Sequence, residues 1–436
     1  MQHDVGALGP AAWLIVTAVK VIVVFTALIT FVALWTWVER KVAGFIQDRL
    51  GPNRVGPWGL FQPVADGLKN ILKEETYPAA ASRLFFVAAP VLALTPSLMT
   101  IAVVPFASPL PTPWGLVDMV VADLPIGVLY ILALTSLGVY GIVIAGWSSN
   151  NKYALLGGLR GSAQMVSYEV GMGMSLVPIF MLAGNVTLTQ VVWTQQEELG
   201  LWLAFPLGLS FLVFLIAAFA ETNRLPFDMP EAESELVAGY HTEYSSMKFS
   251  MFMIAEYANL TVSCAVMATL FFGGWDVPFW AGDNMRVVGP GVVEGAAPTV
   301  WKSLLTMSSF GLKTLIFVLL FMWVRWTVPR FRYDQIMHLG WKILLPVALA
   351  FIGVTGTAIL VLDQLGVEYG LSYGLVLTAV NVVATALFLW LVDRDHVMSG
   401  SWITEQQRQE RLAVVARRRP PGQAGEVPSR EEAAWR

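Results

Sequence analysis

The chain has 436 residues, of which 56% are hydrophobic and 13% are charged. Soluble domains carry roughly 25% charged residues. A water-soluble globule of this length cannot bury so much apolar surface, whereas a lipid bilayer solvates it. The net charge of −4 gives no indication of a nucleic-acid partner. The single cysteine, Cys264, excludes an internal disulfide and an iron–sulfur cluster, because such a cluster needs four ligands.

Apolar runs long enough to cross a bilayer recur along the chain. A transmembrane helix needs about 20 predominantly apolar residues to cross ~30 Å of hydrocarbon. The sequence predicts an all-α polytopic membrane protein with a bundle of nine such helices, because no alternating strand pattern competes. The predicted spans are residues 12–38, 84–106, 125–147, 162–183, 201–220, 249–272, 303–324, 343–362 and 371–392.

Basic residues gather in the loops that follow the odd-numbered spans and in the C-terminal tail. Of the 27 Lys and Arg residues, only Arg286 and Lys302 lie in the even-numbered loops, and Lys20 and Lys313 lie within spans. Cytoplasmic loops carry an excess of Lys and Arg. We therefore expect the odd-numbered loops and the C-terminus to be cytoplasmic and the N-terminus to lie outside.

The predicted membrane domain covers residues 1–398. The tail, 399–436, is rich in Arg, Glu and Pro, and we expect it to be disordered or docked on a partner. Residues 275–301 form a Gly- and Pro-rich external loop. No Lys or Arg precedes the first apolar run, so we expect no cleavable signal peptide.

The first cytoplasmic loop contains a predicted short amphipathic helix. Its apolar stripe consists of Phe61, Val64, Leu68, Ile71 and Leu72. A helix of this kind between two spans belongs at the membrane interface. Two interpretations stay open: a surface anchor, and one lip of an opening through which a lipid-soluble molecule enters.

The loop after the fifth span is rich in carboxylates, which are Glu221, Asp228, Glu231, Glu233, Glu235 and Glu243. Only Arg224 and Lys248 supply positive charge there. Pro230 is well placed to begin a helix, on which Glu231 and Glu235 would share one face. Clustered carboxylates raise one another's pKa where water is partly excluded, so they can exchange protons near neutral pH. The competing interpretation is a solvated acidic loop.

Two glutamates, Glu169 and Glu256, lie inside predicted spans. An ionisable residue in a membrane is costly and therefore indicates function; the alternative is a neutral glutamic acid that joins two helices. Lys20 and Lys313 are candidate members of an outer proton path. The four histidines show no metal-ligand spacing, and no nucleotide-binding motif occurs, so this chain alone is expected to bind neither metal nor nucleotide.

Four long segments, all in predicted cytoplasmic regions or at their edges, resemble one known family. They are residues 39–75 (beginning ERKVAGFIQDRLGPNRVGP), 160–173 (RGSAQMVSYEVGMG), 221–257 (beginning ETNRLPFDMPEAESELVAGYH) and 325–346 (beginning RWTVPRFRYDQIMHLGW). The sequence is similar there to the H subunit, called subunit 1 in mitochondria, of respiratory complex I, the proton-translocating NADH:quinone oxidoreductase.

The resemblance implies a subunit that joins the membrane arm to the hydrophilic arm and forms much of the chamber for the substrate quinone. FMN and iron–sulfur clusters would lie on partner subunits, and small and antiporter-like membrane subunits would be further partners. The resemblance places residues at the quinone entrance and on the charged chamber wall, namely Phe45, Phe61, Leu68, Phe252, Arg40, Lys41, Arg49, Arg54 and Asp66. It places a proton path on Glu169, Glu221, Asp228, Glu231, Glu233, Glu235 and Glu256.

Other functions remain open. The membrane subunit of an energy-converting hydrogenase has this scaffold but reduces no quinone, and the segment GPNRVGP and the full fifth loop favour the quinone enzyme. A stand-alone proton-coupled transporter would often show internal repeats, and the sequence has none. A purely structural anchor would tolerate neutralised loop carboxylates. The ninth span, the external loop and the tail are additions that favour a bacterial plasma membrane.

Overall fold

Long runs of Leu, Val, Ile, Phe and Ala fold into helices here because, in lipid, every backbone N–H and C=O must be bonded within its own segment. The computed structural model describes residues 10–394 except 114, 279 and 290–291. The helices are α1 (Pro10–Ile46), α2 (Gln62–Leu72), α3 (Arg83–Met99), α4 (Gly127–Ser148), α5 (Lys152–Ala183), α6 (Leu188–Trp193), α7 (Gly208–Glu221), α8 (Glu233–Leu236), α9 (Ser246–Phe271), α10 (Val300–Thr327), α11 (Tyr333–His338), α12 (Leu345–Gln364) and α13 (Leu371–Arg394).

Strands in the described residues are confined to two short antiparallel hairpins. β1 (Leu110–Thr112) pairs with β2 (Gly115–Val117), and β3 (Met285–Gly289) pairs with β4 (Val292–Gly295). The chain divides into a unit of residues 1–384 and a C-terminal unit that begins at Thr385. The described part of the second unit is the end of α13, and the predicted tail, 399–436, lies outside the described residues.

Eight helices in the described part of the chain are long and apolar enough to cross a bilayer. They coincide with eight of the predicted spans, and the all-α polytopic class is confirmed. Helix α1 exposes Leu14, Ile15 and Ile22, each by more than half of its surface. An apolar face of this extent suits contact with lipid rather than with water.

The fifth predicted span, 201–220, is interrupted. Helix α7 begins only at Gly208 and has 14 residues, so it is about 21 Å long and does not cross ~30 Å of hydrocarbon alone. Polar side chains bond the backbone before it. Gln195 Oε1 accepts from the N–H of Leu203 at 3.1 Å. Asn381 of α13 accepts from Leu209 N at 3.0 Å and donates to Phe205 O at 2.9 Å.

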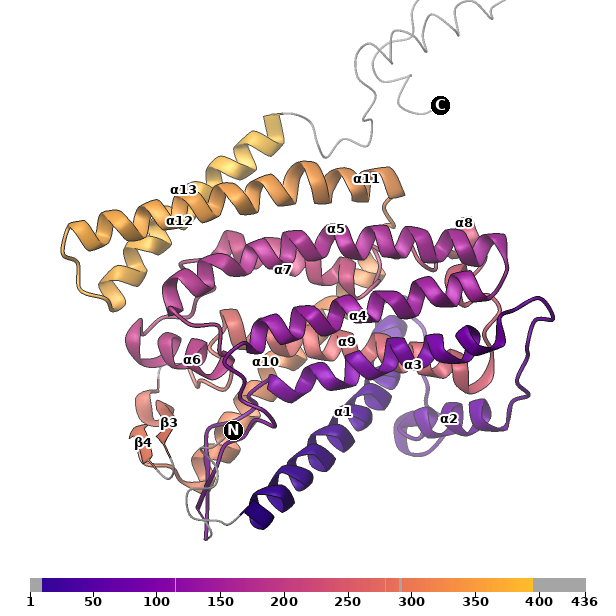
Figure 1. Cartoon of the computed structure of the whole chain (residues 1–436), viewed down its shortest axis with the longest axis horizontal. Coiled ribbons are helices and arrows are strands. Elements are labelled where there is room, and N and C mark those ends of the chain that lie inside the picture. The colour runs from indigo at the N-terminus through magenta and orange to yellow at the C-terminus, as the bar shows by residue number, and fades with distance from the viewer. Residues whose placement is uncertain (1–9, 114, 279, 290–291, 395–436) are drawn as a thin grey trace, which may run out of the picture. The chain divides into compact units, whose positions relative to one another are not determined.

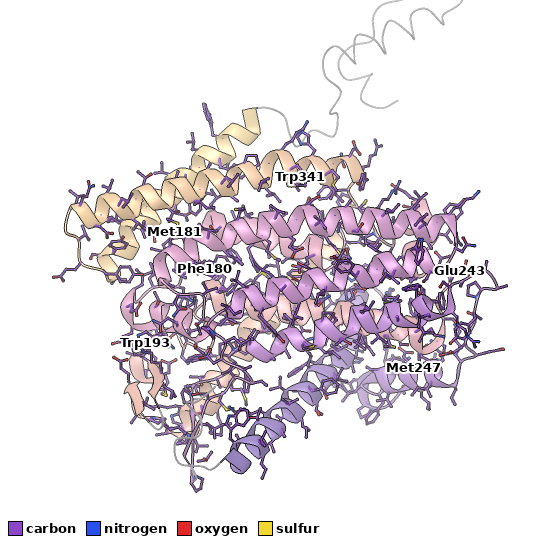
Figure 2. The ribbon with its side chains drawn as sticks, in the orientation of Figure 1. Phe180, Met181, Trp193, Glu243, Met247 and Trp341 are labelled. Atoms are coloured by element: carbon purple, nitrogen blue, oxygen red, sulfur yellow. The ribbon has the colours of Figure 1, made fainter. Side chains whose placement is uncertain are left out.

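The connecting loops lie at two ends of the bundle (Figure 1). We call one end the basic end; it carries α2, α8 and the loops 47–82, 222–245 and 328–332. The opposite end carries α6, both hairpins and the loops 104–126, 184–207 and 272–299. Figure 2 shows Glu243 and Met247 at the basic end and Trp193 at the opposite end.

The loop 222–245 packs closely against α5 at the basic end, and glycines make this approach feasible. A Cβ at Gly157 of α5 would lie 2.7 Å from both Pro230 O and Tyr240 N. Gly239 has a φ of +55°, and a Cβ there would collide with Pro230 O. Only glycine has neither the Cβ nor the conformational penalty at that position. The loop is thus held against the bundle, with its carboxylates near the spans.

Candidate functional site

The buried guanidinium of Arg224 is the centre of a charge network at the basic end. Arg224 lies just after α7, and its side chain is 3% exposed. Its Nε forms an ion pair with Glu256 of α9 at 2.7 Å, and its Nη1 donates to Glu39 of α1 at 3.0 Å. Its Cζ lies 4.2 Å from the centre of the Tyr257 ring. Burial lowers the pKa of Arg224, but the carboxylates of Glu256 and Glu39 outweigh this and raise it, so the cation is permanent.

Glu39 has a second cation. Arg325, near the end of α10, forms an ion pair with Glu39 Oε1, and Tyr257 donates to Glu39 Oε2 at 2.7 Å. We call these five residues the Arg224 network. It contains two carboxylates and two guanidinium groups, and it joins α1, α9, α10 and the start of the loop 222–245. Buried charges of this kind persist only when each has a partner.

Asp228 lies beside this network and pairs with Arg330. Arg330 Nη2 donates to Asp228 Oδ2 at 2.6 Å, whereas the buried Asp228 Oδ1 has no hydrogen-bond partner in the described structure. Burial and the neighbouring charge of Glu231 raise the pKa of Asp228 to about 7, although Arg330 opposes this. Asp228 therefore changes its charge near neutral pH.

Glu231 and His241 form a second titratable pair, with 3.4 Å between Oε1 and Nε2. Burial raises the pKa of Glu231, but the hydrogen bond and charge of His241 outweigh it and hold the pKa below its usual value. Burial lowers the pKa of His241, but Glu231 outweighs it and raises the pKa. Glu231 is therefore a carboxylate and His241 an imidazolium at a pH where a free histidine begins to lose its proton.

The rest of the acidic loop departs from the predicted helix. Helix α8 begins only at Glu233 and has four residues, so Glu231 and Glu235 do not share a helical face. Pro230 instead accepts a backbone hydrogen bond from Tyr240 at 3.2 Å, which turns Glu231 inward toward His241. Glu235 pairs with Arg160 at 2.6 Å and keeps 42% of its side chain exposed. Of Glu233, only the backbone position at the start of α8 is described.

Glu221, at the end of α7, is buried between two small cavities. One, of about 30 Å³, is also lined by Glu231 and Glu256. The other, of about 20 Å³, is also lined by Thr135. Each exceeds the ~10–15 Å³ that one water needs. Ser136, next to Thr135, donates to the carboxylate of Glu169. Glu221 thus borders both cavities, one shared with Glu231 and Glu256 and the other with Thr135, the neighbour of Ser136.

The residues predicted for the quinone entrance lie on α1, on α9, and on α2 or directly before it. These three helices contact one another. Phe45, Phe61 and Leu68 are exposed by 81%, 54% and 56%. Phe252 differs from the expectation. It is 2% exposed and packs edge-on against Tyr240 and Tyr244, because its face of α9 points into the core.

The residues predicted for the charged wall lie at or near the surface of α1, α2 and the loop between them. Arg40 Nη1 pairs with Asp66 of α2 at 2.6 Å. Lys41 Nζ lies 6.0 Å from the centre of the Trp37 ring, Arg49 donates to Gln47 at 2.6 Å, and Arg54 is exposed. The Arg40–Asp66 pair fixes α2 to α1.

A further set of contacts fixes the end of α2 to the start of α9. Ser246 Oγ donates to Asn70 O at 2.8 Å and to Lys73 O at 2.9 Å. Lys248 Nζ pairs with Glu75 at 2.8 Å and lies 3.6 Å from the centre of the Tyr77 ring. The exposed apolar face of α2 is therefore held at a defined position against the bundle.

Of the five residues of the Arg224 network, only Glu256 was predicted from the sequence as a site residue. Glu39 and Arg224 are 185 residues apart, so no local spacing reveals their pairing. The signal that could have found Glu39 is its place at the end of a long apolar run. Among the residues that the structure describes, no three His, Cys, Asp or Glu side chains are placed to hold a metal ion.

Comparison with known proteins gives consistent similarities. A family model described as NADH dehydrogenase matches residues 19–356. The chain is 48% identical over 357 residues to the second H subunit of NADH-quinone oxidoreductase of Koribacter versatilis, an alignment that covers 79% of this chain and 97% of that protein. It is 48% identical to NADH-quinone oxidoreductase subunit 8 of Rhodothermus marinus, covering 78% and 95%. The match to the family model contains the whole Arg224 network, whereas α13 lies beyond it.

Proposed function

Since this chain belongs to the family of the H subunit of NADH-quinone oxidoreductase, and so is a membrane subunit of that enzyme complex, we propose that it forms much of the quinone chamber and couples quinone reduction to proton translocation. The observation that carries the proposal is the buried, titratable charge at the basic end, the end at which α1 and α2 also expose apolar side chains.

Quinone enters from the lipid between α1, α2 and α9. Phe45, Phe61 and Leu68 offer an apolar surface that suits an isoprenoid chain. The headgroup then meets the charged wall that Arg40 and Asp66 begin. This chain supplies no electron carrier, because its one cysteine, Cys264, is fully buried and cannot form a cluster alone. Electrons therefore come from a partner subunit that carries the flavin and iron–sulfur groups.

Quinone reduction takes up two protons with two electrons, and this changes the charge beside the acidic loop. Asp228 responds because its pKa is raised to about 7, so a small change in local potential changes its proton occupancy. The change passes through the carboxylates that share the 30 Å³ and 20 Å³ cavities, which are Glu231, Glu256 and Glu221. Glu169, bonded to Ser136, is the exit of this path toward neighbouring membrane subunits.

The exposed acids of the loop have a lesser part in this path. Glu235 keeps 42% of its side chain in solvent and is paired with Arg160, so its charge is screened by water. The basic end faces the cytoplasm of a bacterium, since it carries most Lys and Arg residues, and there it joins the hydrophilic arm.

A photoreactive quinone analogue tests the proposed chamber in the assembled enzyme. We expect label on residues 45–68, reduced by an excess of natural quinone and lost when Leu68 is changed to Asp. The exposed apolar Leu360 of α12 offers a matched control, Leu360→Asp, at a distant lipid-facing position. Labelling confined to other subunits, or unaffected by L68D, would refute the entrance.

A further inference from the structure

Lys313 is an ionisable residue near the middle of α10 that the proposed quinone and proton path does not use. Its ammonium donates to the carbonyl oxygens of Phe272 at 2.6 Å, Gly274 at 3.1 Å and Asp276 at 2.6 Å. These carbonyls are available because α9 ends at Phe271. Lys313 Nζ also lies 4.5 Å from the centre of the Trp202 ring. The ammonium group is therefore held against the start of the loop 272–299, which belongs to the opposite end of the bundle.

Two aspartates of the loop 272–299 lie beside it. The side chain of Asp276 accepts from Trp202 Nε1 at 2.5 Å and from Gln196 Nε2 at 3.3 Å. Asp283 is 0% exposed. Its Oδ2 accepts from Val277 N at 2.8 Å, but its buried Oδ1 has no hydrogen-bond partner in the described structure. We call Lys313, Asp276 and Asp283 the Lys313 cluster.

The Lys313 cluster holds more carboxylates than cations. With every group ionised, one lysine and two aspartates leave an uncompensated negative charge in a buried position, which is costly. Burial raises the pKa of Asp276, against the opposing effects of Trp202, Lys313 and Gln196. Burial and the charge of Asp276 raise the pKa of Asp283 to about 6. Capping the end of α9 needs only the lysine, so capping does not explain the two buried carboxyl groups.

A cavity gives one member of this cluster, Asp276, access to the surface. It measures about 450 Å³, and its lining includes Asp276 with both of its hydrogen-bond donors, Gln196 and Trp202. The exposed Gly200 and Ala281 also line it, so it reaches the surface of the described structure. The space lies beside residues 201–207, where the fifth span is not helical.

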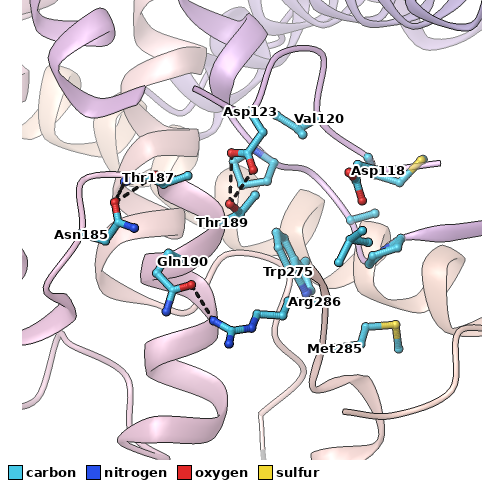
Figure 3. A pocket seen from close by; sticks show the side chains of 15 residues that line it. Asp118, Val120, Asp123, Asn185, Thr187, Thr189, Gln190, Trp275, Met285 and Arg286 are labelled. Atoms are coloured by element: carbon cyan, nitrogen blue, oxygen red, sulfur yellow. Dashed lines mark hydrogen bonds between the residues drawn. The ribbon is translucent and has the colours of Figure 1, made fainter. Parts of the chain in front are cut away.

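Other charged groups near this loop have partners outside the Lys313 cluster. Glu197 accepts from Asn284 at 2.7 Å, and Arg286 is bonded to Gln190 at 2.7 Å and to Glu294. Arg286 and Asp118 line a separate cavity of about 280 Å³ that the same loop borders through Trp275 (Figure 3). Lys313, Asp276 and Asp283 therefore form a separate, buried titratable group at this end.

We propose that the Lys313 cluster is a proton-binding site that exchanges its proton with the outer aqueous phase through the cavity lined by Gln196, Trp202 and Asp276. The proton leaves the neutral carboxyl of Asp276, which lines the cavity, for a water in it. Asp283, which interacts with the charge of Asp276, exchanges its proton through Asp276. The carboxylate left behind is stabilised by the ammonium of Lys313. The direction of this exchange, outward during turnover, rests on the proposed function; the presence of the site does not.

The test uses the assembled enzyme in native membrane vesicles and begins with infrared spectroscopy. We expect the wild type to show a protonated-carboxyl C=O band that titrates from the outer side with a midpoint of about 6. The band should be absent in D283N. It should persist in E294Q, a matched carboxylate-to-amide change at an exposed position of the same loop. A band unchanged in both D283N and D276N would overturn the site.

Proton pumping per NADH oxidised tests its role. We expect D283N and K313M to pump less than wild type, and K313R, which keeps the charge, to restore pumping. If D283N does not assemble, D276N provides the same comparison. Full pumping in D283N together with impaired pumping in D228N would refute this inference alone. Full pumping in both would refute the proposed function as well.

Discussion

Replacing Arg224 by Met tests whether the Arg224 network is a stabilising element of the basic end. The change removes the cation that lies 2.7 Å from Glu256 and 3.0 Å from Glu39. Two carboxylates then face one remaining guanidinium, that of Arg325. Because the side chains of Arg224 and Glu39 are 3% and 6% exposed, water cannot compensate. Breaking a buried ion pair in this way costs about 3–5 kcal/mol.

The matched comparison is Arg160→Met. Arg160 pairs with Glu235 at 2.6 Å, but the two side chains are 31% and 42% exposed, so the loss is about 0–1 kcal/mol. The assay is thermal unfolding of the purified enzyme complex, followed by the release of this subunit. R224M should lower the midpoint clearly more than R160M. Adding Glu39→Gln to R224M should recover part of the loss, because it removes one uncompensated charge. Equal midpoints for R224M and R160M would show that the network has no such energetic role.

Three other outcomes are expected. The pKa of Asp228 is raised from 3.8 to about 7 in the folded protein. Its protonation therefore stabilises the fold at low pH, and this contribution is lost as the pH rises through the folded-state pKa. D228N should remove this pH dependence of the unfolding midpoint, and an unchanged dependence would contradict the raised pKa of Asp228. Asn381→Leu leaves two backbone groups at or just before the start of α7, Leu209 N and Phe205 O, without this partner. It should destabilise the fold by about 1–3 kcal/mol. A neutral effect would mean that other groups bond to them. Lys248→Met removes the 2.8 Å pair with Glu75 and should increase protease cleavage in residues 73–82 without a change at the opposite end. Unchanged cleavage would show that the Lys248–Glu75 pair is not needed to hold this segment.

The spans and the amphipathic helix were predictable from the sequence because hydropathy and helical period are local properties. In residues 62–72, apolar side chains recur at helical spacing on one face and polar side chains occupy the other. Helix α2 forms there with its apolar side chains exposed. The interruption of the fifth span was not predictable in the same way. Residues 201–207 are as apolar as a helix would be, but their backbone groups bond to Gln195, to Phe271 O and to Asn381. The last two partners are distant in sequence.

The site was predictable in its location and only partly in its contacts. The acidic loop lies at the basic end, and the buried Asp228 has a raised pKa, to which the neighbouring Glu231 contributes, as expected of clustered carboxylates. Glu231 differs, because His241 lowers its pKa. The helix expected to begin at Pro230 was wrong, because α8 begins only at Glu233 and has four residues; packing of the loop against α5 overrides the local helix signal. Charge pairs between distant segments, such as Glu39 with Arg224, depend on tertiary packing that no local pattern encodes.

Proton pumping by Asp228→Asn enzyme is the most direct test of the coupling proposed for the basic end. The measurement is protons translocated per NADH oxidised, in vesicles that contain equal amounts of assembled enzyme, with the exposed Glu235→Gln as the matched control. We predict that D228N loses proton translocation while E235Q pumps close to wild type. Undiminished translocation in D228N would contradict the proposal that a buried carboxylate at the basic end links quinone reduction to proton movement.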